Sequence, residues 1–495
     1  MNIKIVNLLI CLVFLTSCKT TDEPQPTPGG GSETTQDITM PRKEMRGVWI
    51  ASVSNIDWPK SSSAEVQKQE YIDYLDLFVK YHVNAVAMQI RPTADAFYNS
   101  PLEPWSQFIT GRQGKDPGYD VLKFMIDEAH KRGLEFHAWM NPYRISNNVN
   151  TFVPSDDHVY KKHKEWTMVY DKLLMFRPAL PEVQQFLVDV IDDLITKYDV
   201  DGIHFDDYFY PYPKTGFTID DAGDFAKYGA GYANIEDFRR GNVNKVIESI
   251  HNLIVKKRPD VLFSISPYGV WRNKKTDPVN GSDSSSSLTN YDDLYADIRL
   301  WCEKGWIDMV VPQLYASTEN IAMNFIKMTD WWTKNSFECP VVIGHGIYKF
   351  GNSAEGAVYM NPLQLDTQFF YARRNSSVQG SFLYNASVFK ENKINILSNL
   401  EKIYADKTPI PFMGRTTLAA PKKVSNLTVS SKVLVWTSQG STMRYIVYKI
   451  IDNKASVIDI ITDNKFTCSE DGNYAVTAIN GDNVESELST VITVK

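Results

Sequence analysis

The chain has 495 residues, of which 43% are hydrophobic and 22% are charged. This composition is close to the globular average, so it excludes a disordered, collagen-like or coiled-coil protein, and the length favours two domains over one. Lys and Arg total 52 against 59 Asp and Glu, for a formal net charge of -7. No long basic run accompanies this balance, so the sequence lacks the electrostatic footprint of a nucleic-acid-binding protein.

The N-terminus predicts an export signal. Lys4 precedes an apolar run over residues 5–15, and Thr16, Ser17 and Cys18 follow it. This run is too short to span a bilayer. With its terminal Cys, segment 1–17 resembles a bacterial lipoprotein signal peptide, which implies that cleavage leaves Cys18 as a lipid-modified first residue. The alternative is an ordinary secretory signal with an incidental Cys.

A segment rich in Thr, Pro, Gly and Ser follows, and it predicts a flexible tether over residues 18–40. We therefore expect an exported protein that is held in the cell envelope by lipid on Cys18. The outer membrane is the expected location, and the sequence does not decide between its periplasmic face and its surface face. Cys302, Cys339 and Cys468 remain after processing, and so sparse and odd a set predicts no disulfide framework.

Short β-rich apolar runs alternate with helical stretches between residues 41 and 405. Two segments, 183–198 and 243–254, repeat apolar residues with helical spacing. This alternation predicts an α/β fold, a (β/α)₈ TIM barrel. The competing doubly wound sheet needs a Gly-rich phosphate turn after its first strand, and the sequence has none there. The eight predicted strands are 47–52, 83–90, 134–140, 202–206, 262–266, 309–314, 341–344 and 380–384.

The pattern changes to short alternating strands after residue 405. We predict a C-terminal all-β, immunoglobulin-like sandwich over residues 418–495. Segment 421–478 resembles a fibronectin type III module, whose expected role is that of a spacer or of a stabiliser of the barrel. The predicted strands are 433–436, 445–448, 474–478 and 491–494.

Reacting groups of a TIM barrel lie at the carboxyl ends of its strands, and the fourth predicted strand carries the richest set there. Its period of two places His204 and Asp206 on one face, and Asp207 follows. Neighbouring acids in a pocket resist ionisation, which favours an acid/base role. The structural alternative is that Asp207 caps the next segment while Asp206 pairs with an Arg.

Polar and aromatic residues also follow the other strands. Asp95 is either a second carboxylate or the partner of Arg91, and Glu319 is the other candidate for a second carboxylate. Such amides, imidazoles and rings suit a polyhydroxylated ring ligand, since rings stack on sugar faces and polar groups bind hydroxyls. A phosphate pocket would need glycines and a Lys instead. The predicted sugar-binding residues are Arg91, His137, Trp139, Asn141, Tyr143, His204, Tyr208, Trp271, Gln313, Tyr315, His345 and Tyr348.

Five ordered segments, within residues 45–50, 89–98, 137–144, 201–208 and 312–315, together resemble the glycosyl hydrolase-like 10 family of bacterial envelope lipoproteins. The resemblance implies a barrel glycosidase that acts on cell-wall glycan, notably peptidoglycan strands without stem peptides. Segment 201–208 is also similar to the family 18 chitinase signature, but His204 replaces an inner acid and Tyr208 stands in place of the proton-donating Glu. A chitinase-like mechanism therefore cannot be copied over.

The sequence thus predicts a lipid-anchored glycoside hydrolase in which Asp206 is nucleophile or stabiliser and Asp207 is acid/base. No cofactor or metal is expected, the partners are a polysaccharide and the membrane, and the oligomeric state stays open. One rival is a metal-dependent deacetylase with His137, His204 and Asp206 as ligands, although the sequence has no typical zinc-ligand spacing. The other is a catalytically silent glycan-binding lipoprotein.

Overall fold

The structure is a computed structural model that describes residues 38–414, 418–440 and 443–495. The expected signal peptide, Cys18 and most of the expected tether lie outside the described residues. The last residues of that tether are described, and Thr39 N donates to Asn453 O at 2.8 Å while Ala455 N donates to Thr39 O at 2.9 Å. Thr39 therefore pairs with Lys454 at the start of strand β15 (Lys454–Ile461), so this end of the segment is held in the fold.

Eight parallel strands close into a barrel, and each overlaps a predicted strand. The barrel closes because β1 pairs with both β2 and β11. The predicted TIM barrel is confirmed. Its strands are β1 (Met45–Ile50), β2 (Ala85–Arg91), β3 (Glu135–Met140), β7 (Gly202–Phe205), β8 (Leu262–Ile265), β9 (Met309–Val310), β10 (Val341–Gly346) and β11 (Val378–Tyr384).

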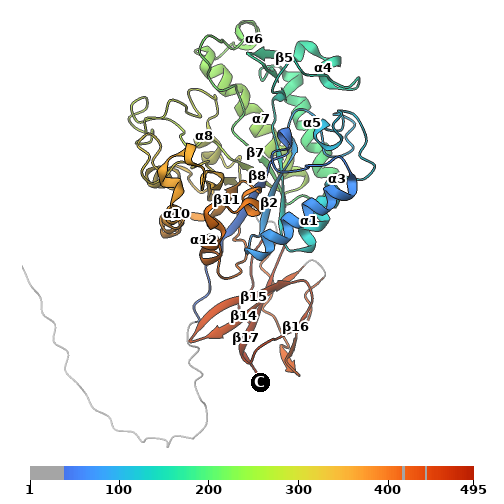
Figure 1. The fold of residues 1–495 in the computed structure, drawn as a ribbon, viewed down its shortest axis with the longest axis vertical. Coiled ribbons are helices and arrows are strands. Elements are labelled where there is room, and N and C mark those ends of the chain that lie inside the picture. The colour runs from blue at the N-terminus through green and yellow to red at the C-terminus, as the bar shows by residue number, and fades with distance from the viewer. Residues whose placement is uncertain (1–37, 415–417, 441–442) are drawn as a thin grey trace, which may run out of the picture. The chain divides into compact units, whose positions relative to one another are not determined.

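Helices lie around the outside of the barrel (Figure 1). The apolar face predicted for segment 183–198 is buried in α5, from Val183 to Ile195. Helix α7 begins where the Asn234 side chain accepts from Asp237 N, which satisfies a free donor of the first turn. The longer helices are α1 (Ala64–Lys80), α3 (Val121–Lys131), α5 (Pro181–Lys197), α7 (Ile235–Lys257), α9 (Phe325–Asn335), α10 (Leu363–Arg374) and α12 (Ile396–Ile403).

Long loops join the strands to these helices, and some hold elements that the sequence did not predict. A three-stranded antiparallel sheet follows β3, with β6 between β4 and β5. These elements are β4 (Arg144–Ser146), β5 (Thr167–Tyr170), β6 (Leu173–Phe176), α2 (Gln107–Thr110), α4 (Val159–Lys162), α6 (Ala222–Tyr228), α8 (Ile298–Glu303) and α11 (Val388–Glu391).

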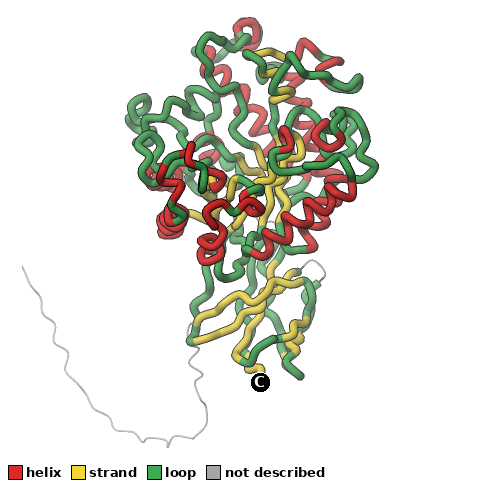
Figure 2. The backbone as a smooth tube through the Cα atoms, viewed as in Figure 1, coloured by secondary structure: helices red, strands yellow, loops and turns green. Residues whose placement is uncertain are grey.

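The C-terminal region is all-β, as predicted, and forms two antiparallel sheets (Figure 2). Leu434, Trp436, Tyr445 and Val476 contribute to the core of this region. The assignment to a fibronectin type III module stays a prediction. One sheet holds β12 (Thr428–Ser430), β13 (Val433–Val435) and β16 (Lys465–Thr467), and the other holds β15, β14 (Arg444–Ile451), β17 (Gly472–Ile479) and β18 (Ile492–Val494).

None of the helices among the described residues combines the length and the apolar character that crossing a membrane requires. Cys302, Cys339 and Cys468 are all buried, and each is a free cysteine.

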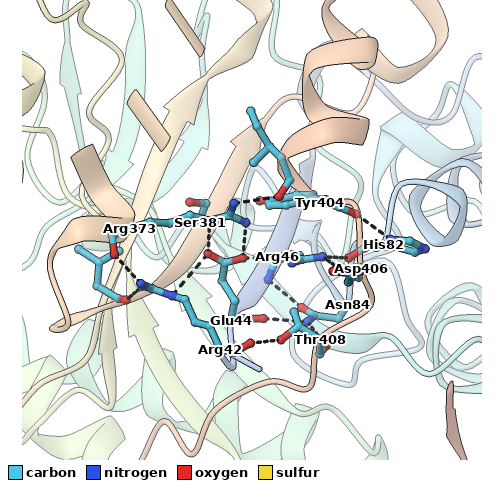
Figure 3. Close-up of polar contacts among 12 residues, drawn as sticks. Arg42, Glu44, Arg46, His82, Asn84, Arg373, Ser381, Tyr404, Asp406 and Thr408 are labelled. Carbon is cyan, nitrogen blue, oxygen red and sulfur yellow. Dashed lines mark hydrogen bonds and ion pairs between the residues drawn. The ribbon is translucent and has the colours of Figure 1, made fainter. Parts of the chain in front are cut away.

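A buried ion network lies at the start of β1, at the opposite end of that strand from the barrel mouth (Figure 3). The Glu44 carboxylate lies 3.1 Å from Arg46 Nε and 2.7 Å from Arg373 Nη2. Burial acts to raise the pKa of Glu44, but the hydrogen bonds and charges of Arg373 and Arg46 outweigh it, so the pKa lies below its usual value. Arg46 also donates to Asp406 O at 2.7 Å, which ties the first strand to the segment after α12.

Replacing Glu44 with Ala should destabilise the protein by about 3–5 kcal/mol, because it leaves the buried Arg46 guanidinium without its carboxylate. Urea unfolding at pH 7 measures the change. The control is Asp283→Ala, which breaks a surface ion pair with Lys327. This variant should lose far less stability, because the Asp283 and Lys327 side chains are 74% and 52% exposed. Equal losses for the two variants would contradict this account of the network.

Candidate active site

Two consecutive acids, Asp206 and Asp207, follow the last residue of β7, and both are buried. The Asp206 carboxylate is held by three donors. Asn141 Nδ2 and Trp139 Nε1 donate to Oδ2 at 2.6 and 3.2 Å, and the backbone N–H of Tyr208 donates to Oδ1 at 3.3 Å. Burial raises the pKa of Asp206, while the Arg144 charge and the Asn141 amide act to lower it.

The Asn141 amide is itself oriented by its neighbours. Its Oδ1 accepts from Gln89 Nε2 at 2.7 Å and from Arg144 Nη2 at 2.8 Å, so its Nδ2 is directed to Asp206. Gln89 is fixed in turn, since its Oε1 accepts from the backbone N–H groups of Ser52 and Val53. This chain of hydrogen bonds links strands β1, β2 and β3 to the acid at the end of β7.

Different charges act on Asp207 and on its neighbour Asp206. Burial and the negative charge of Asp206 raise its pKa to about 7, although hydrogen bonds from Tyr212 and Gln313 act to lower it. At neutral pH a large fraction of Asp207 therefore carries a proton. A protonated acid beside a fixed carboxylate is an arrangement suited to general acid catalysis.

The two acids line a cavity of about 220 Å³ at the barrel mouth. A cavity of about 360 Å³ shares Arg144 and Tyr208 with it, and a third of about 580 Å³ shares Gln313 and Tyr315 with it. The three cavities therefore adjoin one another through shared wall residues. Together they are called the groove, and the two acids line its central cavity. The central cavity is lined by Trp49, Val53, Ile56, Gln89, Trp139, Arg144, Asp206, Asp207, Tyr208, Ser266, Gln313, Tyr315 and Tyr384.

Many of the predicted site residues meet in this groove. Asn141 contacts the groove indirectly, because its side chain donates a hydrogen bond to the Asp206 carboxylate. Tyr143 lines one flanking cavity and Tyr348 the other. The predicted residues in the central cavity are Asp206, Asp207, Trp139, Tyr208, Gln313 and Tyr315.

The structure does not place His204 and His137 in the lining of the central cavity, because both side chains are buried inside the barrel. Trp49 Nε1 donates to His204 Nε2 at 2.9 Å, so the proton of His204 is on Nδ1, which donates to Ser264 Oγ. Burial lowers the pKa of His204 to about 3, which keeps it neutral. His137 Nε2 lies 3.2 Å from Glu135 Oε2, and neither residue lines the cavity.

The predictions for strand two and for Glu319 are also corrected. Arg91 is buried in an ion pair with Glu103 instead of Asp95, with Nε to Oε2 at 2.7 Å. Asp95 is buried away from the cavity, where it accepts from Gln113 Nε2 at 3.0 Å. Glu319 is exposed on the loop after β9 and does not line the groove. None of these three is placed to touch a bound sugar.

Trp271 and His345 are core residues and not subsites. Trp271 stacks on Trp331 with ring centroids 5.7 Å apart, and its Nε1 donates to Asp297. His345 stacks on Phe369 at 4.5 Å, and its two ring nitrogens contact Gln368 and Ser381. Neither lines the groove, because each packs outward against a helix.

Several residues of the site were not predicted as such, and five of them contact other residues of the site. Their common signal is position, since each of the five lies on a barrel strand or in a loop beyond a strand's carboxyl end. Tyr384 stacks on Tyr315 with centroids 5.7 Å apart, and Arg144 lies over the Tyr208 ring at 4.9 Å. The five are Trp49, Gln89, Arg144, Tyr212 and Tyr384.

The metal-dependent rival is not supported by the placement of its proposed ligands. His204 is bonded to Trp49 and Ser264, and His137 to Glu135, so the imidazoles do not converge with Asp206 on one point of the cavity. Within the described part of the chain, no group of three His, Cys, Asp or Glu residues is placed to hold a metal ion.

The glycosyl hydrolase-like 10 family model matches residues 44–360, which hold every strand of the barrel except the last. The chain belongs to this family. It is 43% identical over 388 residues to glycosyl hydrolase YngK of Bacillus subtilis strain 168, covering 77% of this chain and 76% of that protein. It is 37% identical over 372 residues to glycosyl hydrolase DigH of Escherichia coli K12, covering 70% and 83%.

Among solved structures, the glycoside hydrolase domain of PgaB (BpsB) from Bordetella bronchiseptica matches 73% of this chain and 99% of that domain. The TM-score is 0.47 at 10% sequence identity. A likeness this low supports no assignment of substrate or mechanism. Family membership and the closed barrel identify a glycosidase-type fold, and such a fold implies a polysaccharide substrate.

Two Trp variants test which rings belong to the groove. Trp139→Phe should weaken binding of a glycan oligosaccharide by about 2- to 10-fold, because the smaller ring loses part of a stacking contact worth roughly 0.5–1.5 kcal/mol and the Nε1 donor to Asp206 is lost. Trp271→Phe should leave the affinity unchanged and lower the melting temperature, because this ring packs in the core. Isothermal titration calorimetry and thermal unfolding measure the two effects. A loss of affinity in Trp271→Phe that matches Trp139→Phe would contradict the placement.

Proposed function

We propose that the protein is a glycoside hydrolase of the cell envelope that cleaves peptidoglycan glycan strands lacking stem peptides. The observation that carries the hydrolase assignment is the pair of buried acids, Asp206 and Asp207, in the middle of an aromatic-lined groove. Glycosidic bonds are cleaved by such acids, because one protonates the leaving oxygen while a negative charge stabilises the oxocarbenium-like transition state.

The roles of the two acids follow from their surroundings. Asp207 holds a proton near neutral pH and donates it to the glycosidic oxygen. Asp206 is fixed by Trp139, Asn141 and the Tyr208 N–H, so its charge is in place before the reaction begins. A preorganised charge of this kind stabilises a transition state without reorganisation.

The groove supports a polymeric substrate. Cavities on both sides of the acids share wall residues with the central one, so a glycan chain can extend past the cleaved bond in both directions. Peptide-free peptidoglycan is the substrate that the resemblance to this family implies, and lipid on Cys18 would hold the enzyme beside that polymer.

The substrate test uses purified peptidoglycan with intact stem peptides, the same material after amidase treatment, and a panel of other glycans. Mass spectrometry should detect released oligosaccharides from the peptide-free strands. Asp207→Asn should reduce this release by about 100- to 10,000-fold, as expected for loss of a general acid. The control is Glu319→Gln, an exposed acid outside the groove, which should keep wild-type activity. Glycan binding without any released product would contradict the hydrolase and favour the silent binding lipoprotein.

The acid role of Asp207 predicts a pH dependence. Its pKa is raised to about 7, so the reactive protonated form is lost as the pH rises through 7, and kcat/KM should fall on that side. Tyr212 stabilises the deprotonated form by donating to Oδ2, so Tyr212→Phe should move the falling limb to higher pH. The exposed Tyr371 supplies the control, and Tyr371→Phe should leave the profile unchanged. A limb that stays in place in Tyr212→Phe would argue against Asp207 as the acid.

A further inference from the structure

The groove contains an unusual set of acids for a hydrolase that uses two enzyme carboxylates. Of the described residues that line the central cavity, only Asp206 and Asp207 are acidic. In the flanking cavities, Asp171 is bonded to Lys214, and Glu355 lies 3.0 Å from Lys349. Among the described residues, therefore, no acid from another barrel strand faces the pair across the central cavity.

This placement conflicts with direct attack by an enzyme carboxylate. A nucleophile or base and the general acid normally flank the glycosidic bond from two sides. Here both carboxyl groups enter the cavity from the end of one strand, β7, as consecutive residues. The enzyme thus supplies an acid and a neighbouring charge, but no carboxylate on the far side of the sugar.

The hydrogen bonds of Asp206 point to a supporting role. A carboxylate offers about four acceptor positions. Two donors already use Oδ2 and one uses Oδ1, so a single position on Oδ1 remains for the substrate. An oxygen held in this way is suited to accept an N–H from a bound sugar.

We propose, on the basis of the proposed function, that the sugar at the cleavage site is a 2-acetamido sugar whose own carbonyl oxygen is the nucleophile. That oxygen bonds to C1 while the C1–O glycosidic bond breaks, and the electron pair of the broken bond leaves with the glycosidic oxygen. Asp207 transfers its proton to that oxygen. Asp206 accepts the acetamido N–H and stabilises the positive charge of the cyclic oxazolinium ion.

Water completes the reaction. It attacks C1 and gives a proton to the Asp207 carboxylate, while the bond between C1 and the acetamido oxygen breaks and restores the N-acetyl group. Two displacements at C1 give a product with retained configuration. Trp49, Trp139 and Tyr384 line the same cavity and supply apolar surface for the acetamido methyl group.

The test compares oligosaccharides that differ only in the N-acyl group of the sugar at the cleavage site. Replacing acetyl with mono-, di- and trifluoroacetyl weakens the carbonyl nucleophile, so kcat should fall stepwise along the series. A free amine at this position should abolish cleavage. Asp206→Asn should reduce kcat by about 100- to 1,000-fold, as for loss of a preorganised stabilising group. Glu319→Gln should show the same fluorine dependence as the wild type.

Rates that do not depend on fluorination, an inverted product by proton NMR, or a covalent sugar on Asp206 after treatment with a 2-deoxy-2-fluoro glycosyl fluoride would each overturn this mechanism. All three outcomes require the enzyme to break a bond at C1 of a sugar, so they leave the proposed hydrolase intact. Failure of the intact protein to cleave any glycan overturns both proposals.

Discussion

The site depends on one electrostatic constraint, which is that two adjacent carboxyl groups in a buried cavity cannot both be charged at low cost. Three donors and the nearby Arg144 stabilise the charge on Asp206. Burial, together with the negative charge of Asp206, raises the pKa of Asp207 to about 7. The two side chains are chemically identical and differ in the charges near them, since Arg144 favours ionisation of Asp206 and the Asp206 carboxylate opposes ionisation of Asp207.

The geometry of the barrel places these different contacts around the two acids. Carboxyl ends of parallel strands meet at one mouth, so Gln89 on β2 and Asn141 after β3 can form a relay to the end of β7. Neutral His204 and Trp49 lie beneath the pair, joined by a hydrogen bond of 2.9 Å. A network of charged groups at the opposite end of β1, centred on Glu44, ties this strand to the rest of the barrel.

The sequence predicted all eight barrel strands, because buried parallel strands are short apolar runs between helices. It also predicted Asp206, Asp207, Trp139 and Asn141, which extend from strand ends. The sequence pattern does not give the depth of a side chain inside the barrel. A period of two assigns His137 and His204 to the inward face, but it does not say how far below the mouth they lie. It also could not pair Arg91 with Glu103, because that contact depends on the path of a loop.

The central physical claim is that Asp207 is protonated near neutral pH beside a charged Asp206. Infrared difference spectroscopy between the wild type and Asp207→Asn measures this directly through the carbonyl stretch of a protonated carboxyl group. The account predicts a band that is present at pH 6, is lost as the pH rises through about 7, and is missing in the variant. A difference spectrum without a carboxyl band between pH 5 and 7 would contradict it.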